Sequence, residues 1–256
     1  MPSIGYKLYG SGPEKVLVMH NWFGDCTSYE LMLPHLDTKQ FTFLFMDLRG
    51  YGLSKNIPGK FSVREASADA LQLMHSLGWK KFHIIGHSMS GMIAQKIGLD
   101  AEELVKSIVA ITPVPACGSP KTPELMAFLI DAALSSDENA IECVHQLTSH
   151  QHTDEFARKI VTAWRKCSTP EARVAYLHMF SDTDFSSAVK GLKIPMLVIY
   201  GENDFKEEEA LMRRTFLAWY PNAQLECCKN AGHFPMQEAP IPLAASILKF
   251  LHEHFE

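Results

Sequence analysis

The chain has 256 residues, of which 46% are hydrophobic and 21% charged, a composition typical of an ordinary globular protein with one large core. Its net charge of -5 and its pI near 6.2 argue against binding to nucleic acid, which requires a basic face. The composition therefore excludes a nucleic-acid-binding or disordered protein and leaves a globular one.

Residues 1–5 contain neither a basic nor an apolar signal segment, and no apolar stretch is long enough to span a bilayer. The six cysteines are scattered and include no C-x-x-C pair. We therefore expect a cytoplasmic protein with reduced thiols that binds no membrane.

The first part of the chain alternates strands and helices. Apolar runs predict strands at residues 4–9, 16–19 and 41–46, the first two joined by a tight turn. Four apolar residues before the third strand have a spacing that fits a helix: Tyr29, Leu31, Leu33 and Leu36. A further helix is predicted from Ser62, which forms a capping box with Glu65, to Gly78.

A predicted strand, a sharp turn and a predicted helix surround Ser88. The apolar run at residues 82–85 indicates a buried strand, and Met92, Ile93 and Ile97 follow at helical spacing. This is the context of a nucleophile elbow, where strained backbone angles require small residues two before and two after the serine. Those residues are Gly86 and Ser90, so a serine replaces the usual second glycine.

The chain then changes character twice. After a predicted strand at residues 105–111, four helical patterns follow without a strand between them. Each begins at a residue that can cap a helix: Thr122, Ser136, Thr153 and Thr169. Strands at 194–200 and 224–228 and helices after each resume the alternation, which predicts a mostly parallel sheet with helices on both faces.

Polar clusters follow four of these strands, at His20–Trp22, Ser88, Asp204 and His233. The carboxyl ends of parallel strands meet at one edge of a sheet, so we expect these clusters to lie together. A serine hydroxyl, an imidazole and a carboxylate are what nucleophilic acyl transfer requires. We therefore predict Ser88, His233 and Asp204 as catalytic residues, with Glu202 as an alternative acid.

Acyl transfer also needs two N–H groups aimed at the developing oxyanion. The backbone N–H groups of Trp22 and Met89 are the predicted donors of this oxyanion hole, because they follow an earlier strand and begin the helix after Ser88.

Five segments together resemble the α/β-hydrolase-fold superfamily of serine hydrolases, over essentially the whole chain. These segments are residues 20–24, 47–54, 86–91, 201–204 and 230–233. The resemblance implies an α/β core at residues 1–115 and 188–256, with an inserted helical cap at residues 116–187. It also implies the Ser88–His233–Asp204 triad and the Trp22 and Met89 oxyanion hole. Asn21 departs from the family, which usually has glycine there, and Ser90 is the second departure.

The predicted function is hydrolysis of a carboxylic ester or lactone of a small, largely apolar substrate through an acyl-enzyme on Ser88. Hydrolysis of a C–C bond by the same triad, a small-molecule receptor with slow turnover, and a cofactor-free dioxygenase remain alternatives. No cofactor is expected, and the histidines of the helical segment lack the spacing of a metal site. The sequence leaves the oligomeric state open.

Other side chains have predicted supporting roles. The candidates for contact with substrate are Asn21, Trp22, Trp164, Phe128 and Tyr176. Hydrogen bonds from His20 are expected to support the oxyanion loop, His87 is expected to be a packing and hydrogen-bonding residue, and Asp47 and Arg49 are expected to tie loops together.

Overall fold

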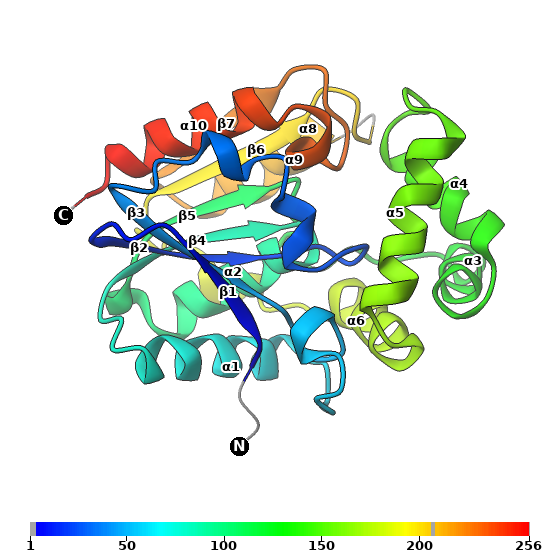
Figure 1. Cartoon of the computed structure of the whole chain (residues 1–256), viewed down its shortest axis with the longest axis horizontal. Helices are drawn as coiled ribbons and strands as arrows, with labels where there is room; N and C mark the ends of the chain where they lie inside the picture. Colours follow the sequence, from blue (N-terminus) through cyan, green and yellow to red (C-terminus); the bar gives the residue numbers. More distant parts are fainter. Residues whose placement is uncertain (1–3, 206–207, 256) are drawn as a thin grey trace.

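The computed structural model describes residues 4–205 and 208–255, which form a seven-stranded sheet in the order β1-β3-β2-β4-β5-β6-β7 (Figure 1). All neighbouring strands are parallel except β1 and β3. The strands are β1 (Tyr6–Tyr9), β2 (Glu14–Met19), β3 (Phe41–Met46), β4 (Phe82–His87), β5 (Val105–Ile111), β6 (Met196–Gly201) and β7 (Ala223–Cys228). The predicted fold class is confirmed.

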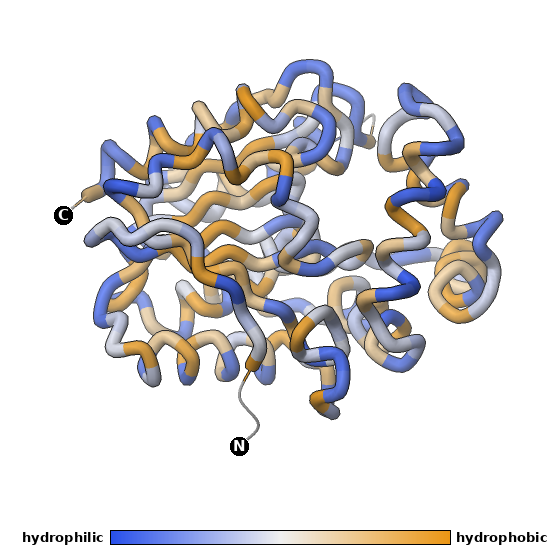
Figure 2. The backbone as a smooth tube through the Cα atoms, viewed as in Figure 1, coloured by the Kyte–Doolittle hydropathy of each residue, from blue (hydrophilic) through white to orange (hydrophobic). Residues whose placement is uncertain are grey.

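Helices cover both faces of this sheet (Figure 1). The helices α1 (Val63–Ser76) and α2 (Met89–Asp100) pack against each other on one face, and α10 (Pro240–His252) lies on the other. The strands β3 and β4 are therefore buried at every residue, as expected for strands covered on both sides. Hydrophobic residues are frequent in the strands at the centre of the molecule (orange in Figure 2). Their unbroken apolar runs are the reason that the sequence predicts them well.

Four consecutive helices lie beside the carboxyl ends of the strands (green in Figure 1), and we refer to them as the four-helix segment. They are α3 (Pro123–Leu134), α4 (Asp137–Leu147), α5 (Asp154–Cys167) and α6 (Pro170–Asp182). At each start the predicted capping side chain accepts a hydrogen bond from the N–H three residues later. The predicted helix starts are thus confirmed.

Shorter elements complete the chain. They are the 3-10 turns η1 (Cys26–Tyr29), η2 (Leu33–His35), η3 (Gly52–Ser54) and η4 (Glu102–Leu104), the helices α7 (Ser186–Val189), α8 (Glu208–Met212) and α9 (Pro235–Glu238), and the π-helical turn η5 (Arg213–Leu217).

The turns η1 and η2 replace the helix predicted over residues 29–36, so that prediction is wrong. Pro34 has no N–H to donate to Glu30, which prevents a continuous α-helix, and Leu31 is 55% exposed instead of buried.

Two further details differ from expectation. The tight turn after β1 does not make a hairpin with β2, because β1 crosses to pair with β3, with Tyr6 opposite Met46. The Ser62 hydroxyl caps α1 through the N–H of Glu65. The Glu65 carboxylate, however, accepts from the N–H groups of Lys60 and Phe61, so only half of the predicted capping box forms.

Loops on the carboxyl side are held by buried charges, as predicted for Asp47 and Arg49. The Asp47 carboxylate accepts from the N–H groups of Cys26 and Leu53 at 2.7 and 2.8 Å. The Arg49 guanidinium binds both oxygens of Asp69 at 2.6 and 2.7 Å. These bonds fix the loops after β2 and β3 relative to α1.

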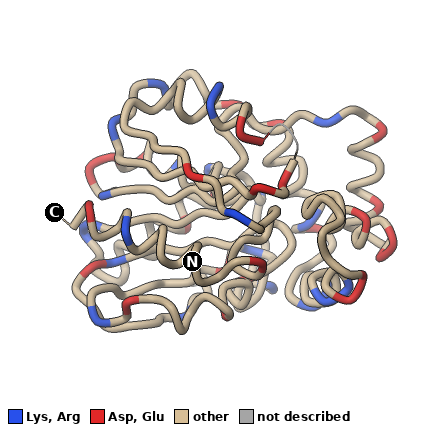
Figure 3. The backbone as a smooth tube through the Cα atoms, turned by 90° about the horizontal axis from the view of Figure 1, so that it is seen from above, with Lys and Arg blue, Asp and Glu red and all other residues tan. Residues whose placement is uncertain are grey.

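Positions with Lys or Arg are interspersed with positions that carry Asp or Glu, as Figure 3 shows. Within residues 4–205 and 208–255, no helix is both long and apolar enough to cross a bilayer.

Candidate active site

Ser88 is held in a strained turn between β4 and α2. Its backbone has φ 56° and ψ −116°, in a region that only glycine enters without cost. A Cβ at Gly86 would lie 2.3 Å from the carbonyl oxygen of Ser90, and one at Gly91 would lie 2.3 Å from Pro113. Two glycines therefore allow the tight turn, the second being Gly91 because Ser90 occupies the usual glycine position.

Ser90 has a role of its own in this turn. Its hydroxyl donates a hydrogen bond to the carbonyl of His20, in the loop after β2. The His20 ring donates from Nδ1 to the carbonyl of Asn21 at 2.7 Å and accepts from the N–H of Leu48 at 3.1 Å. Burial lowers the pKa of His20, which keeps the ring neutral and able to accept. The elbow and the loop that carries Trp22 are thus fixed together, as expected for His20.

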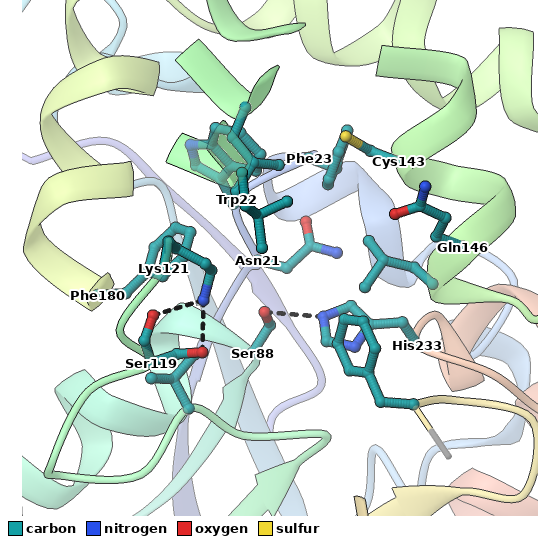
Figure 4. A pocket seen from close by; sticks show the side chains of 15 residues that line it. Asn21, Trp22, Phe23, Ser88, Ser119, Lys121, Cys143, Gln146, Phe180 and His233 are labelled. Carbon is teal, nitrogen blue, oxygen red and sulfur yellow. Dashed lines mark hydrogen bonds between the residues drawn. The ribbon is translucent and has the colours of Figure 1, made fainter. Parts of the chain in front are cut away.

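The three predicted catalytic side chains meet at the carboxyl edge of the sheet (Figure 4). His233 Nε2 lies 2.9 Å from Ser88 Oγ, and His233 Nδ1 lies 2.9 Å from Asp204 Oδ2. Ser88 follows β4, Asp204 follows β6 and His233 follows β7. Each of these three residues is more than nine-tenths buried. The arrangement can move a proton from the hydroxyl to an imidazole that the carboxylate orients.

Glu202, the alternative acid, makes its hydrogen bonds to residues other than His233. Its carboxylate pairs with Lys229 at 2.8 Å and accepts from the N–H of Asn230 at 3.0 Å. The side chain is 40% exposed, so it belongs to the surface of the loop after β6.

The backbone around His233 is fixed from several directions. The buried Glu238 carboxylate accepts from the N–H groups of Gly232 and Phe234, on either side of the imidazole, at 2.8 and 2.7 Å. The N–H of His233 itself donates to the carbonyl of Leu147, at the end of α4, at 2.9 Å. The His87 ring donates to the His233 carbonyl at 2.6 Å, which is the hydrogen-bonding role expected for His87.

The electrostatic environment favours a protonated His233. Burial lowers the pKa of this imidazole, but the charge and hydrogen bond of Asp204 and the charges of Glu208 and Glu238 outweigh burial and raise it. Glu208 is itself buried, and burial together with the Asp204 charge raises its pKa to about 8. Glu208 therefore lies buried beside the Asp204–His233 pair. The sequence gives no signal for this burial, because Glu208 stands in a run of acidic residues.

A pocket of about 170 Å³ opens above Ser88 and His233 (Figure 4). Asn21 and Trp22 line it, as predicted. The other lining residues were not predicted to contact substrate: Phe23, Val114, Ser119, Lys121, Leu125, Leu129, Cys143, Gln146, Leu147, Phe180 and Phe205. Most of them come from the four-helix segment and the loop that precedes it, and they make the pocket largely apolar.

Three of the predicted substrate contacts, Trp164, Tyr176 and Phe128, do not line this pocket. Trp164 is fully buried between Trp22, Phe23 and the guanidinium of Arg173. It fills the contact between α5 and the loop after β2.

The other two are Tyr176 and Phe128. Tyr176 packs on Tyr51 and Phe61 of the loops after β3, and Phe128 on α3 packs against the buried core. Trp164 and Tyr176 pack the four-helix segment against loops of the core, and their helical spacing alone could not show this.

The predicted oxyanion donors are available. Among the hydrogen bonds of the described residues, none uses the N–H of Trp22 or of Met89. The loop of Trp22 is anchored through other atoms: its indole N–H donates to the carbonyl of Arg173 at 2.8 Å, and its carbonyl accepts from Tyr51 Oη at 2.9 Å.

Three of the histidines of the four-helix segment and its loops form hydrogen bonds with carboxylates. The described residues contain no group of three or more His, Cys, Asp or Glu side chains that could hold a metal ion.

Comparison with known proteins agrees with this architecture. Residues 15–240 match the family model of the α/β hydrolase fold. A 2-hydroxy-6-oxononadienedioate/2-hydroxy-6-oxononatrienedioate hydrolase of Pseudomonas putida is 25% identical, over 96% of this chain and 90% of the relative. A pimeloyl-[acyl-carrier protein] methyl ester esterase of Yersinia pseudotuberculosis is 23% identical over 96% of both chains.

Among solved structures, a thermophilic esterase of Thermogutta terrifontis superposes with a TM-score of 0.81. It is 25% identical to this chain, covering 99% of this chain and 94% of its own.

The geometry predicts how His233 titrates. Asp204 supplies the largest effect that raises the His233 pKa, so Asp204→Asn should lower that pKa. Glu202→Gln removes an exposed carboxylate that pairs with Lys229, and it should leave the His233 pKa unchanged. The imidazole NMR signals of His233, followed against pH, give the pKa in each variant. A His233 pKa that falls in Glu202→Gln but not in Asp204→Asn would contradict the assignment of the pair.

Proposed function

The chain belongs to the α/β-hydrolase fold family, and we propose that it is a serine hydrolase that cleaves a carboxylic ester or lactone of a small, largely apolar substrate through an acyl-enzyme on Ser88. The observation that supports this most is the pair of 2.9 Å contacts that join Ser88, His233 and Asp204 beneath an apolar pocket. The similarity to esterases and hydrolases over almost the whole chain supports the reaction class.

In the proposed acylation, the substrate carbonyl lies above Ser88 Oγ in the pocket. His233 Nε2 takes the hydroxyl proton while Oγ attacks the carbonyl carbon, and Asp204 stabilises the imidazolium that forms. The N–H groups of Trp22 and Met89 then stabilise the oxyanion; loss of one such donor typically costs about 10²–10³ in kcat. The imidazolium returns its proton to the alkoxide, and the alcohol leaves.

In the proposed deacylation, water occupies the place of the alcohol and gives a proton to His233 as it attacks the acyl-enzyme. Collapse of the second tetrahedral intermediate releases the acid and restores Ser88. His233 must be neutral to act as a base in both steps. Since its pKa is raised, activity should increase with pH through that pKa and decline below it.

The four-helix segment acts in this proposal as a cap that shapes the pocket. Leu125, Leu129 and Leu147 supply apolar surface, and Phe180 lies against Trp22 with a centroid separation of 5.7 Å. Asn21, where the family usually has glycine, presents its amide to the pocket and is proposed to contact a polar atom of the substrate. An acyl or lactone carbonyl would thus react at the polar floor of an apolar enclosure.

The first test is covalent labelling. A fluorophosphonate probe should modify the wild-type protein at Ser88, and the rate should rise with pH as His233 loses its proton, because only the activated hydroxyl reacts. Ser88→Ala should abolish labelling, whereas Ser90→Ala keeps the nucleophile and should retain it. Protein that is folded by circular dichroism yet unlabelled at Ser88 would contradict the proposal.

Hydrolysis of a C–C bond is the second candidate, favoured by the similarity to the Pseudomonas putida dienedioate hydrolase. The same three side chains would serve, so the substrate must decide between the candidates. A panel of aryl esters of increasing acyl length, acyl lactones and a vinylogous diketone should show the highest kcat/KM for an ester or lactone. If kcat/KM is higher for the diketone by a factor of ten or more, C–C bond hydrolysis replaces ester hydrolysis as the proposed function. A factor of ten in kcat/KM corresponds to roughly 1.4 kcal/mol of transition-state stabilisation.

A further inference from the structure

Among the described residues that line the apolar pocket, one is a lysine, Lys121. It lies in the loop between β5 and α3, next to the capping residue of α3. In Figure 4, Lys121 and Ser119 stand on one side of Ser88 and His233 stands on the other. A charged amine in an enclosure otherwise formed mainly by Leu, Phe and Trp side chains requires an explanation, because burial of an unpaired charge is costly.

The ammonium group of Lys121 has only neutral partners. It donates to the carbonyl and to the hydroxyl of Ser119, and it lies 5.8 Å from the centre of the Phe180 ring. Among the described residues no carboxylate is within ion-pair distance. Asp182 favours the charged form through space, but its own carboxylate pairs with His178 at 3.0 Å.

Burial lowers the pKa of Lys121 to about 8, a value that still lies above neutral pH. The described side chains that line the pocket include no Asp or Glu that could neutralise this charge. The pocket is thus complementary to a substrate that brings a negative group of its own.

We propose that Lys121 and the Ser119 hydroxyl form an anion subsite, and that the substrate carries a carboxylate in addition to its scissile ester or lactone bond. A single ammonium with a neighbouring hydroxyl balances one negative charge, which matches a carboxylate better than a doubly charged phosphate. The apolar side chains that line the pocket would pack on the chain that joins the two groups.

The inference rests on the proposed function and narrows its substrate class to ester carboxylates, such as half-esters of dicarboxylic acids. For a half-ester, water adds across the acyl–oxygen bond, and the products are a dicarboxylate, an alcohol and one proton. Lys121 takes no part in bond breaking; it determines specificity by positioning the carbonyl through the remote carboxylate.

Two matched substrate pairs test the subsite. Monomethyl adipate against methyl hexanoate places the carboxylate in the acyl part, and 6-acetoxyhexanoate against hexyl acetate places it in the alcohol part. The wild-type protein should prefer the carboxylate in at least one pair. In Lys121→Met, the ratio of kcat/KM for the charged over the neutral ester should fall about tenfold or more.

Matched variants control for indirect effects. Lys121→Arg should restore most of the ratio, because it keeps the charge. Lys190→Met removes a lysine that also lies over an aromatic ring, Trp219, but outside the pocket, and it should leave the ratio unchanged. An unaltered ratio in Lys121→Met, in a protein that folds like the wild type, would overturn the inference.

A binding measurement separates failure of the subsite from failure of the proposed function. In the Ser88→Ala background, calorimetry with monomethyl adipate should show affinity that Lys121→Met weakens by about tenfold or more. If the wild type hydrolyses none of the four esters but this Lys121-dependent affinity remains, ester hydrolysis fails and the subsite stands. Equal affinity with and without Lys121 would overturn the subsite, whatever the turnover.

Discussion

The hydrogen-bonded chain from Ser88 through His233 to Asp204 depends on the close approach of three loops at one edge of a parallel sheet. A Cβ at Gly201 would lie only 2.1 Å from the carbonyl oxygen of Gly232, so the loops that carry Asp204 and His233 touch through glycine backbone. Parallel pairing of β4, β5, β6 and β7 places the carboxyl ends of β4, β6 and β7 at the same edge of the sheet. The strained backbone of Ser88 lies at the same edge of the sheet, and backbone hydrogen bonds from several elements hold it in this conformation.

Burial gives each ionisable group near this chain a distinct role. Burial lowers the pKa of His87 and of His20, which favours the neutral rings. Both rings form hydrogen bonds to the backbone of neighbouring loops. His233 is the exception, because Asp204 compensates its burial. Lys121, on the side of Ser88 away from His233, has no carboxylate partner within residues 4–205 and 208–255. A pocket that separates a proton-accepting imidazole from an unpaired ammonium favours substrates with a reacting carbonyl at one end and an anion at the other.

Sequence reasoning succeeds where local pattern determines structure. The strands at residues 41–46 and 105–111 and the capped starts of α3 to α6 are found where predicted, because unbroken apolar runs and hydroxyl caps act over a few residues. It also brings Ser88, Asp204 and His233 to one edge, since strand direction alone places them. It fails where tertiary packing decides. Helical spacing could not show whether Trp164 and Tyr176 face the core or the pocket, and it could not show that Glu208 is buried or that Lys121 lines the pocket.

Direct detection of the covalent intermediate tests the central claim that these three side chains perform acyl transfer. Rapid acid quench during turnover of an aryl ester, followed by intact mass and peptide mapping, should show the wild-type chain heavier by one acyl group, located on the peptide that contains Ser88. The acyl group should be lost on longer incubation as His233 activates water. Turnover of the ester without an adduct, or an adduct on another residue that persists in Ser88→Ala, would contradict the account.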